Sequence, residues 1–335
     1  MTPIISFIIP VYNVEKYISR CLDSIYALKM ELEQFEILCI DDCSQDSSVF
    51  IIENYLKNFD NIKLLRHKKN GRQGAARNTG IRNAIGNYCM FIDADDSLPV
   101  VNIIDLLLYM QQNNLELLIG KANVITQNED YYTWGGVQME KTSFMSGPTA
   151  FINKQILKTA FGVVWLAIYK IDLVKRIPPF HENVQYEDTD WTLRCAYEAK
   201  LLQYRPIVLY NYHNNPATTT TTKSINSLIA RTKQSLRLYH WALTTSNQHN
   251  EVIITVEEYG VWNLRGLNAL ITFSRKDRKL FYKSFTSEEL KKIANWKGSS
   301  INYTIFFVKY PILSQVILYI LHPIYRIYNS IKRII

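Results

Sequence analysis

Three carboxylates crowd into four residues of this 335-residue chain: Asp93, Asp95 and Asp96. They follow the apolar run 88–92, which predicts a buried strand. Carboxyl ends of parallel strands border the crevice where open α/β sheets bind ligands. Carboxylate oxygens suit Mg²⁺ and Mn²⁺, and these ions bind diphosphates. The cluster is therefore a candidate metal site, although the same string also fits a solvated loop, or a cap on a helix from Leu98.

Polar groups also recur at the ends of other predicted strands. The apolar run 4–11 is followed by Tyr12, and the run 35–40 is followed by Asp41 and Asp42. In a doubly wound sheet these strand ends share one edge with the acidic cluster, so their side chains converge. One acidic turn is usually only a turn, but repeated placement at one edge favours a ligand site.

Alternating strand and helix patterns would position these groups. Apolar runs at 4–11, 35–40, 62–65 and 88–92 predict strands, and helical spacing between them predicts crossover helices. This alternation predicts an α/β fold with a doubly wound, mainly parallel sheet. Beyond about residue 125 the pattern is less regular, and helical periodicity dominates from residue 225 to 296.

The motifs together resemble glycosyltransferase family 2. The resemblance rests on segments 5–13, 40–46, 70–80, 91–96 (the DXD motif) and 186–188 (the ED motif), with Cys43 where the family usually has glycine. Their order and spacing match over residues 4–215. The family implies a GT-A fold and sugar transfer from a nucleotide-diphosphate sugar, usually with inversion. The expected organisation is a GT-A catalytic domain at 1–215, a helical C-terminal extension at 216–300 and a basic apolar tail at 301–335.

The resemblance implies a role in nucleotide binding for seven residues. Pro10, Val11 and Tyr12 line the nucleoside, Asp42 accepts a hydrogen bond from uracil, Arg77 lies near the base, and Asp93 and Asp96 hold the ribose or metal-bound waters. A UDP-sugar is favoured only through Asp42 and Arg77. The structural alternatives are a helix cap for Asp42 and a surface helix charge for Arg77.

The remaining acids are assigned to the metal and to catalysis. Asp95 is the expected ligand of Mn²⁺ or Mg²⁺, which would neutralise charge on the departing nucleotide. Asp188 is the expected general base, with Glu187 beside it, because inverting transfer needs a carboxylate that takes the proton of the acceptor hydroxyl. The alternative for both is helix capping.

Three further side chains are candidates for acceptor or diphosphate contacts. Trp165 and Trp191 could stack on sugar rings, although core packing explains them equally well. His213 could approach the metal or the diphosphate, although a lone histidine is more often structural. The expected acceptor is a saccharide or a lipid-linked oligosaccharide, as in the assembly of bacterial surface polysaccharide.

The net charge of +8 is concentrated at the C-terminal end. Seven cations and no acid follow Glu289, so the rest of the chain is nearly neutral and offers no basic stripe for nucleic acid. The tail 301–335 is too interrupted for a spanning helix. It fits a helix at the membrane interface or one packed on the domain.

The first apolar run lacks the features of a secretory leader, and five cysteines without paired spacing indicate reduced thiols. We therefore expect a cytoplasmic protein, with peripheral contact at the inner face of the cell membrane through the tail. Two rival functions remain. A nucleotidyl- or phosphotransferase would not explain the acids at 187–188, and intact acids throughout argue against a non-catalytic, membrane-associated binding protein.

Overall fold

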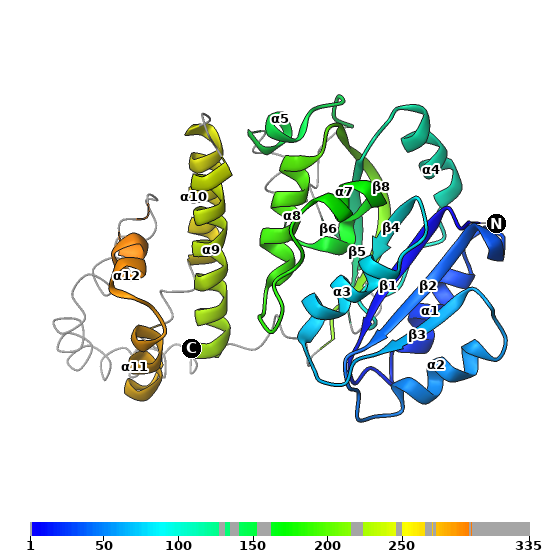
Figure 1. Ribbon diagram of the computed structural model, residues 1–335, viewed down its shortest axis with the longest axis horizontal. Helices are drawn as coiled ribbons and strands as arrows, with labels where there is room; N and C mark the ends of the chain where they lie inside the picture. Colours follow the sequence, from blue (N-terminus) through cyan, green and yellow to red (C-terminus); the bar gives the residue numbers. More distant parts are fainter. Residues whose placement is uncertain are drawn as a thin grey trace, which may run out of the picture. The chain divides into compact units, whose positions relative to one another are not determined.

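The computed structural model describes residues 2–126, 131–134, 141–152, 162–215, 224–245, 250–264, 270, 273–294 and 296. The chain divides into two compact units, Met1–Thr221 and Thr222–Ile335. The first unit contains a sheet with its helices, and the second is helical in its described part (Figure 1). The predicted tail 301–335 lies outside the described residues.

Eight strands of the described chain form one sheet. They are β1 (Ile5–Val11), β2 (Phe35–Asp41), β3 (Ile62–Arg66), β4 (Tyr88–Phe91), β5 (Leu117–Ile125), β6 (Tyr131–Trp134), β7 (Ala167–Lys170) and β8 (Leu202–His213). Their order is β3-β2-β1-β4-β7-β5-β6, and β8 pairs with β5. The four strands β3, β2, β1 and β4 are parallel, which confirms the predicted doubly wound core. Reversed β7 then joins β4 to β5, and β8 runs parallel to β5.

Strand β1 lies between β2 and β4, so the strand order reverses there. Val11 at the end of β1 pairs with Asp41 at the end of β2, and Ile8 pairs with Phe91 at the end of β4. The segments after these three strands therefore leave the sheet at one edge. A reversal of strand order is where open α/β sheets bind ligands, so the fold brings the predicted motifs to one crevice.

Helices of the first unit are α1 (Ile18–Tyr26), α2 (Ser48–Leu56), α3 (Arg72–Asn83), α4 (Ile103–Gln112), α5 (Gly147–Ile152), α7 (Ile171–Arg176) and α8 (Glu187–Glu198). Helix α3 packs closely on the sheet because Gly80 faces it. A Cβ at Gly80 would lie 2.3 Å from Cγ2 of Ile8 in β1 and 3.2 Å from Cδ1 of Ile40 in β2. A side chain there would push the helix away from the strands.

The helix expected from Leu98 begins later, at Ile103. Leu98 precedes Pro99, and a residue before proline avoids the helical region of backbone space. Asn102 is the actual cap, since its side chain accepts a hydrogen bond from the backbone N–H of Asp105. Capping therefore does not explain the acidic cluster at 93–96.

The second unit contains α9 (Ile225–Thr245), α10 (Asn250–Leu264), α11 (Arg275–Lys283) and α12 (Ser287–Ala294). Residues of α9, α11 and α12 and of the segments beside them form a small core, whose buried members are Ile225, Leu228, Leu270, Phe281, Phe285, Ile293 and Trp296. The helical periodicity predicted for 225–296 is confirmed in these elements. No helix among the described residues has the length and apolarity needed to cross a membrane.

Candidate functional site

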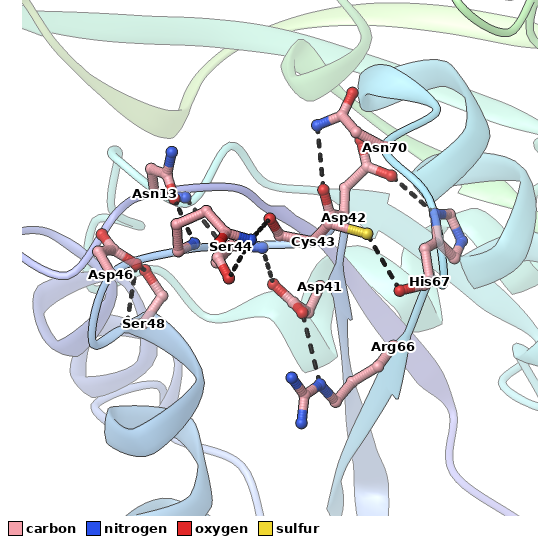
Figure 2. A network of polar contacts seen from close by, with 11 residues as sticks. Asn13, Asp41, Asp42, Cys43, Ser44, Asp46, Ser48, Arg66, His67 and Asn70 are labelled. Atoms are coloured by element: carbon pink, nitrogen blue, oxygen red, sulfur yellow. Dashed lines mark hydrogen bonds and ion pairs between the residues drawn. The ribbon is translucent and has the colours of Figure 1, made fainter.

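The turn after β2 is fixed by hydrogen bonds within the turn and to residues of the neighbouring strand ends (Figure 2). The backbone N–H of Ser44 donates to Oδ1 of Asp41 at 2.9 Å, and Asp41 also pairs with Arg66 on β3. Asn13, which follows β1, accepts a hydrogen bond from the backbone of Gln45 at 2.8 Å. These contacts tie the ends of three adjacent strands together.

Asp42 is the buried acid of this turn, with only 2% of its surface exposed. Its Oδ1 accepts a hydrogen bond from the backbone N–H of Gly71 at 2.9 Å and pairs with Nδ1 of His67 at 2.8 Å. Asn70 donates to its backbone carbonyl at 3.0 Å. Asp42 is thus held from the loop that precedes α3, and the helix-cap alternative is wrong.

His67 is a site residue that the sequence analysis missed. It lies one residue beyond β3, at the same edge as the other polar groups. Its position after a predicted strand was the available signal. A histidine between an arginine and a lysine suggests an exposed position, however, and its partners lie 25 and 12 residues away in the chain.

The segment predicted to line the nucleoside presents one accessible side chain. Pro10 and Val11 are buried within β1, whereas half of Tyr12 is exposed. Of the three residues, Tyr12 is thus placed to offer a ring face to a base or a ribose. A nucleoside could contact Pro10 and Val11 only through their backbone atoms, because their side chains are buried.

Arg77 is a buried cation that bridges two acids. Its Nη2 donates to Oδ1 of Asp93 at 2.8 Å, and its Nη1 donates to Oε1 of Glu187 at 2.5 Å. Only 1% of Arg77 is exposed, so the alternative of a surface charge is wrong. The guanidinium contacts one carboxylate from the segment after β4 and one from α8, and its predicted place near the base stays a prediction. The two acids raise its pKa against the opposing effect of burial.

The ED motif forms the first turn of α8. Tyr186, which precedes the helix, adopts a left-handed conformation with φ 59°, and Glu187 is buried. Burial and the nearby charges of Glu187 and Asp93 raise the pKa of Asp188 to about 7, although Arg77 acts in the opposite direction. A carboxyl that titrates near neutral pH can accept a proton from a hydroxyl and release it again.

Helix α3 approaches this motif closely through Gly74. A Cβ at Gly74 would lie 2.3 Å from the backbone oxygen of His181 and 3.0 Å from Cγ of Glu187. No side chain fits there without moving the backbone. Gly74 therefore allows α3 to pack closely against the first turn of α8.

Asp96 is buried and binds other residues of the protein through both of its carboxylate oxygens. Its Oδ1 accepts a hydrogen bond from the backbone of His213 at 2.7 Å, and its Oδ2 accepts one from the Tyr210 hydroxyl at 2.9 Å. The same hydroxyl accepts a hydrogen bond from the backbone N–H of Asp93. With 1% exposure and both oxygens engaged, Asp96 cannot hold a ribose here, which corrects that expectation.

Asp95 and Asp93 are the partly exposed acids of the cluster. Oδ2 of Asp95 accepts a hydrogen bond from Asn215 at 3.2 Å, and one fifth of the Asp93 side chain is exposed. Burial and the Asp93 carboxylate raise the pKa of Asp95. Crowded acids of this kind suit a divalent cation. No group of three or more candidate metal ligands occurs among the described side chains.

The two tryptophans proposed for acceptor contacts pack against other rings. Trp191 has no exposed surface and stacks on Phe180, with ring centroids 4.1 Å apart. Trp165 is 5% exposed and stacks on Tyr210 at 4.4 Å and on Tyr212 at 5.8 Å. We therefore remove both from the sugar-contacting set, because their faces are covered by aromatic neighbours.

His213 is near the acidic cluster but is held by the protein. Its Nε2 lies 2.9 Å from Oγ of Ser97, and its backbone binds Asp96. Burial, aided by Arg20, lowers the pKa of His213 to about 4, so the ring is neutral at pH 7. These contacts favour the structural alternative for His213.

The chain is similar in sequence to a family of glycosyltransferases and to individual bacterial members of it. The sequence model of Glycosyl transferase family 2 matches residues 6–177, just over half of the chain. The uncharacterized glycosyltransferase EpsJ of Bacillus subtilis is 32% identical over 220 residues, which are 64% of this chain and 62% of EpsJ. A poly(ribitol-phosphate) beta-glucosyltransferase of Bacillus spizizenii is 39% identical over 122 residues, which are 36% of this chain and 19% of that protein. The match thus spans less than two thirds of the length of either relative.

Solved structures show a similar fold at low sequence identity. Staphylococcus aureus TarS 1-349 in complex with UDP-GlcNAc superposes with a TM-score of 0.71 at 17% identity, and the match covers 91% of this chain and 87% of that one. A mannosyltransferase from Pyrobaculum calidifontis, in complex with GDP-Man and Mn²⁺, gives a TM-score of 0.56 at 15% identity, with 92% and 86% covered. The fold is therefore the predicted GT-A fold with a helical C-terminal region.

Proposed function

Since this chain belongs to Glycosyl transferase family 2, we propose that it transfers a sugar from a nucleotide-diphosphate sugar to an acceptor hydroxyl. The observation that carries this proposal is the bridge made by Arg77. It joins Glu187 of the ED motif to Asp93 of the DXD motif. The candidate base beside Glu187 and the candidate diphosphate site beside Asp93 therefore border one crevice.

The proposed donor is a UDP-sugar. Asp42 is fixed at the end of β2, where its carboxylate can accept a hydrogen bond from the N–H of a uracil ring, and Tyr12 supplies an exposed ring beside it. The similar fold of TarS in complex with UDP-GlcNAc supports this choice. The sugar itself is left open by these contacts.

The residues present fit a divalent cation, Mn²⁺ or Mg²⁺. Asp95, with Asp93 beside it, would hold the ion, because Mg²⁺ is commonly bound by one or two carboxylates together with substrate phosphates. When bound, the ion would neutralise charge that develops on the departing diphosphate. Mn²⁺ in the structure of the Pyrobaculum mannosyltransferase supports this proposal.

Asp188 is the proposed general base. The acceptor oxygen attacks the anomeric carbon as the bond from that carbon to the diphosphate breaks, and Asp188 takes the proton of the hydroxyl. Attack opposite the leaving group inverts the anomeric centre. Arg77 holds Glu187 and thereby fixes the first turn of α8, which carries Asp188.

The proposed acceptor is a saccharide or lipid-linked oligosaccharide of a bacterial surface polymer. Two relatives are named for poly(ribitol-phosphate) acceptors, which supports a surface polymer as the class. We place the reaction in the cytoplasm, with the tail 301–335 as a peripheral contact at the inner membrane face. Deleting the tail and measuring sedimentation with anionic vesicles tests that contact.

The decisive experiment combines a substrate screen with one substitution. Wild-type protein, Mn²⁺, a saccharide acceptor and a panel of nucleotide sugars should yield free UDP and a glycosylated acceptor. Asp188→Asn should lower transfer by about a thousandfold while the affinity for UDP stays within about threefold, because it removes the base but not the nucleotide site. The matched control is Asp172→Asn, an acid whose side chain is 73% exposed.

Three outcomes contradict parts of the proposal. Near wild-type transfer by Asp188→Asn would remove its role as base. Transfer of UMP to the acceptor, with release of a sugar 1-phosphate instead of UDP, would identify a nucleotidyltransferase. A product that retains the anomeric configuration, measured by NMR, would exclude direct inversion.

A further inference from the structure

The side chain of His67 connects the acidic turn to α3. Its Nδ1 lies 2.8 Å from Oδ1 of Asp42, and its Nε2 lies 2.9 Å from Oγ1 of Thr79. Its backbone N–H donates to the carbonyl of Asp41 at 2.8 Å, which fixes the residue beside the end of β2. Figure 2 shows the ring next to Asp42 and Asn70. His67 lies outside the family motifs identified in the sequence.

The direction of these hydrogen bonds can be assigned from their partners. A carboxylate only accepts hydrogen bonds, so Nδ1 of His67 carries a proton and donates to Asp42. Arg82 donates to Oγ1 of Thr79 at 2.8 Å, and a guanidinium only donates. The Thr79 hydroxyl can donate its own proton to Nε2 when that nitrogen carries none. These contacts link Arg82, Thr79, His67 and Asp42 in one hydrogen-bond network, and the members of such networks strengthen one another.

The hydrogen bonds to the Asp42 side chain both fall on one of its two oxygens. Oδ1 receives both His67 and the backbone N–H of Gly71, at 2.8 and 2.9 Å. Within the described residues, Oδ2 receives no hydrogen bond from the protein. Two donors on one oxygen prevent rotation of the carboxylate and set the direction in which the other oxygen points.

We propose that His67 is a positioning residue that orients Asp42 to select uridine over cytidine nucleotides. The inference rests on the proposed function, in which Asp42 accepts a hydrogen bond from the base. Uracil carries a proton on N3, whereas cytosine presents a lone pair there. A fixed carboxylate oxygen binds the first and repels the second. A carboxylate that can turn loses part of this discrimination.

Two substitutions of His67 distinguish the contact made by Nδ1 from the contact made by Nε2. The amide nitrogen introduced by His67→Asn lies near the place of Nδ1 and can still donate to Asp42. The amide introduced by His67→Gln reaches the place of Nε2, so it keeps the Thr79 contact and loses the Asp42 contact. Thr79→Val provides a milder third change, because it removes the hydrogen-bond partner of Nε2 and leaves the contact between His67 and Asp42 in place.

The test is calorimetric titration of the full-length chain and its variants with UDP and with CDP. We expect His67→Gln to weaken UDP binding about tenfold and CDP binding by less than about twofold, since a lost charge-assisted hydrogen bond has this magnitude. His67→Asn should stay within about threefold of wild type for UDP, and Thr79→Val should lower the UDP preference about threefold. In transfer assays, His67→Gln should raise KM for the donor and leave kcat within about twofold, because the acceptor side is unchanged.

An unchanged ratio of UDP to CDP affinity in His67→Gln would overturn the inference. If that variant fails to melt cooperatively, an unchanged ratio in Thr79→Val would do the same. Failure of the proposed function looks different. In that case the wild-type protein would show no preference for UDP, or Asp42→Ala would bind UDP as tightly as wild type.

Discussion

At the scale of single residues, each acid in the crevice has a different environment. Asp42 and Asp96 are buried and receive hydrogen bonds on their carboxylates, so they are fixed. Asp95 and Asp93 are partly exposed and fit a cation. Asp188 has a pKa raised to about 7 by burial and by the charge of Glu187. Environment, and not residue type, divides these five carboxylates into positioning, metal-binding and proton-accepting groups.

The raised pKa of Asp188 predicts opposite effects of pH on activity and on stability. A base must be ionised, so kcat/KM should rise with pH and reach half its maximum near pH 7. A carboxyl whose folded-state pKa lies above its unfolded value stabilises the fold at low pH, and this contribution is lost as pH rises through about 7. Asp188→Asn cannot ionise, so its melting temperature should fall less than that of wild type between pH 5.5 and pH 8.

Two measurements check this prediction. The pH dependence of kcat/KM gives the apparent pKa of the free enzyme, and thermal melts of both proteins at each pH give the stability difference. A flat rate profile between pH 6 and 8, or parallel loss of stability in both proteins, would contradict it.

At the scale of elements, sequence patterns predicted the parallel strands well. The strands Ile5–Val11 and Phe35–Asp41 are mostly apolar because both of their faces are buried. The acids that follow them could therefore be assigned to one edge. The contacts that fix those acids could not be predicted, because their partners are distant in sequence. Tyr210 lies 114 residues from Asp96, and Glu187 lies 110 residues from Arg77.

Arg77 carries the next prediction, because it joins α3, the end of β4 and the start of α8. Arg77→Gln leaves two carboxylates without their buried cation, and removing one partner of a buried ion pair costs about 3–5 kcal/mol. We expect a loss of this size in the free energy of unfolding, measured by urea denaturation. The apparent pKa in the rate profile should also move upward, since Arg77 lowers the pKa of Asp188.

Arg72→Gln is the matched control, because Arg72 lies in the same helix and is exposed. It should change stability by less than about 0.5 kcal/mol, as is usual for surface substitutions. Equal effects of the two substitutions would show that the bridge contributes nothing to the fold.

At the scale of the whole molecule, the candidate site belongs to one unit. Every residue assigned to the nucleotide, the metal or the proton lies within Met1–Thr221, as does the segment 6–177 that matches the family. This unit also contains the whole eight-stranded sheet. The described helices of the second unit have a core of their own, built around Phe281 and Trp296. The described residues of the candidate site therefore all come from the first unit.

This separation predicts that residues 1–221 alone fold and bind UDP. A unit of this length with its own buried core is within the usual size of an independent domain. We expect a single cooperative melt and an affinity for UDP within about threefold of the full-length chain, because all nucleotide contacts are retained. Calorimetry compares the two proteins, and Asp42→Ala in the shorter one provides the negative control.

Transfer to the acceptor is the function that the shorter protein can lose, so intact UDP binding with lost transfer would assign acceptor recognition to residues 222–335. A shorter protein that melts without cooperativity, or that binds UDP more than about tenfold more weakly, would show that the two units depend on each other.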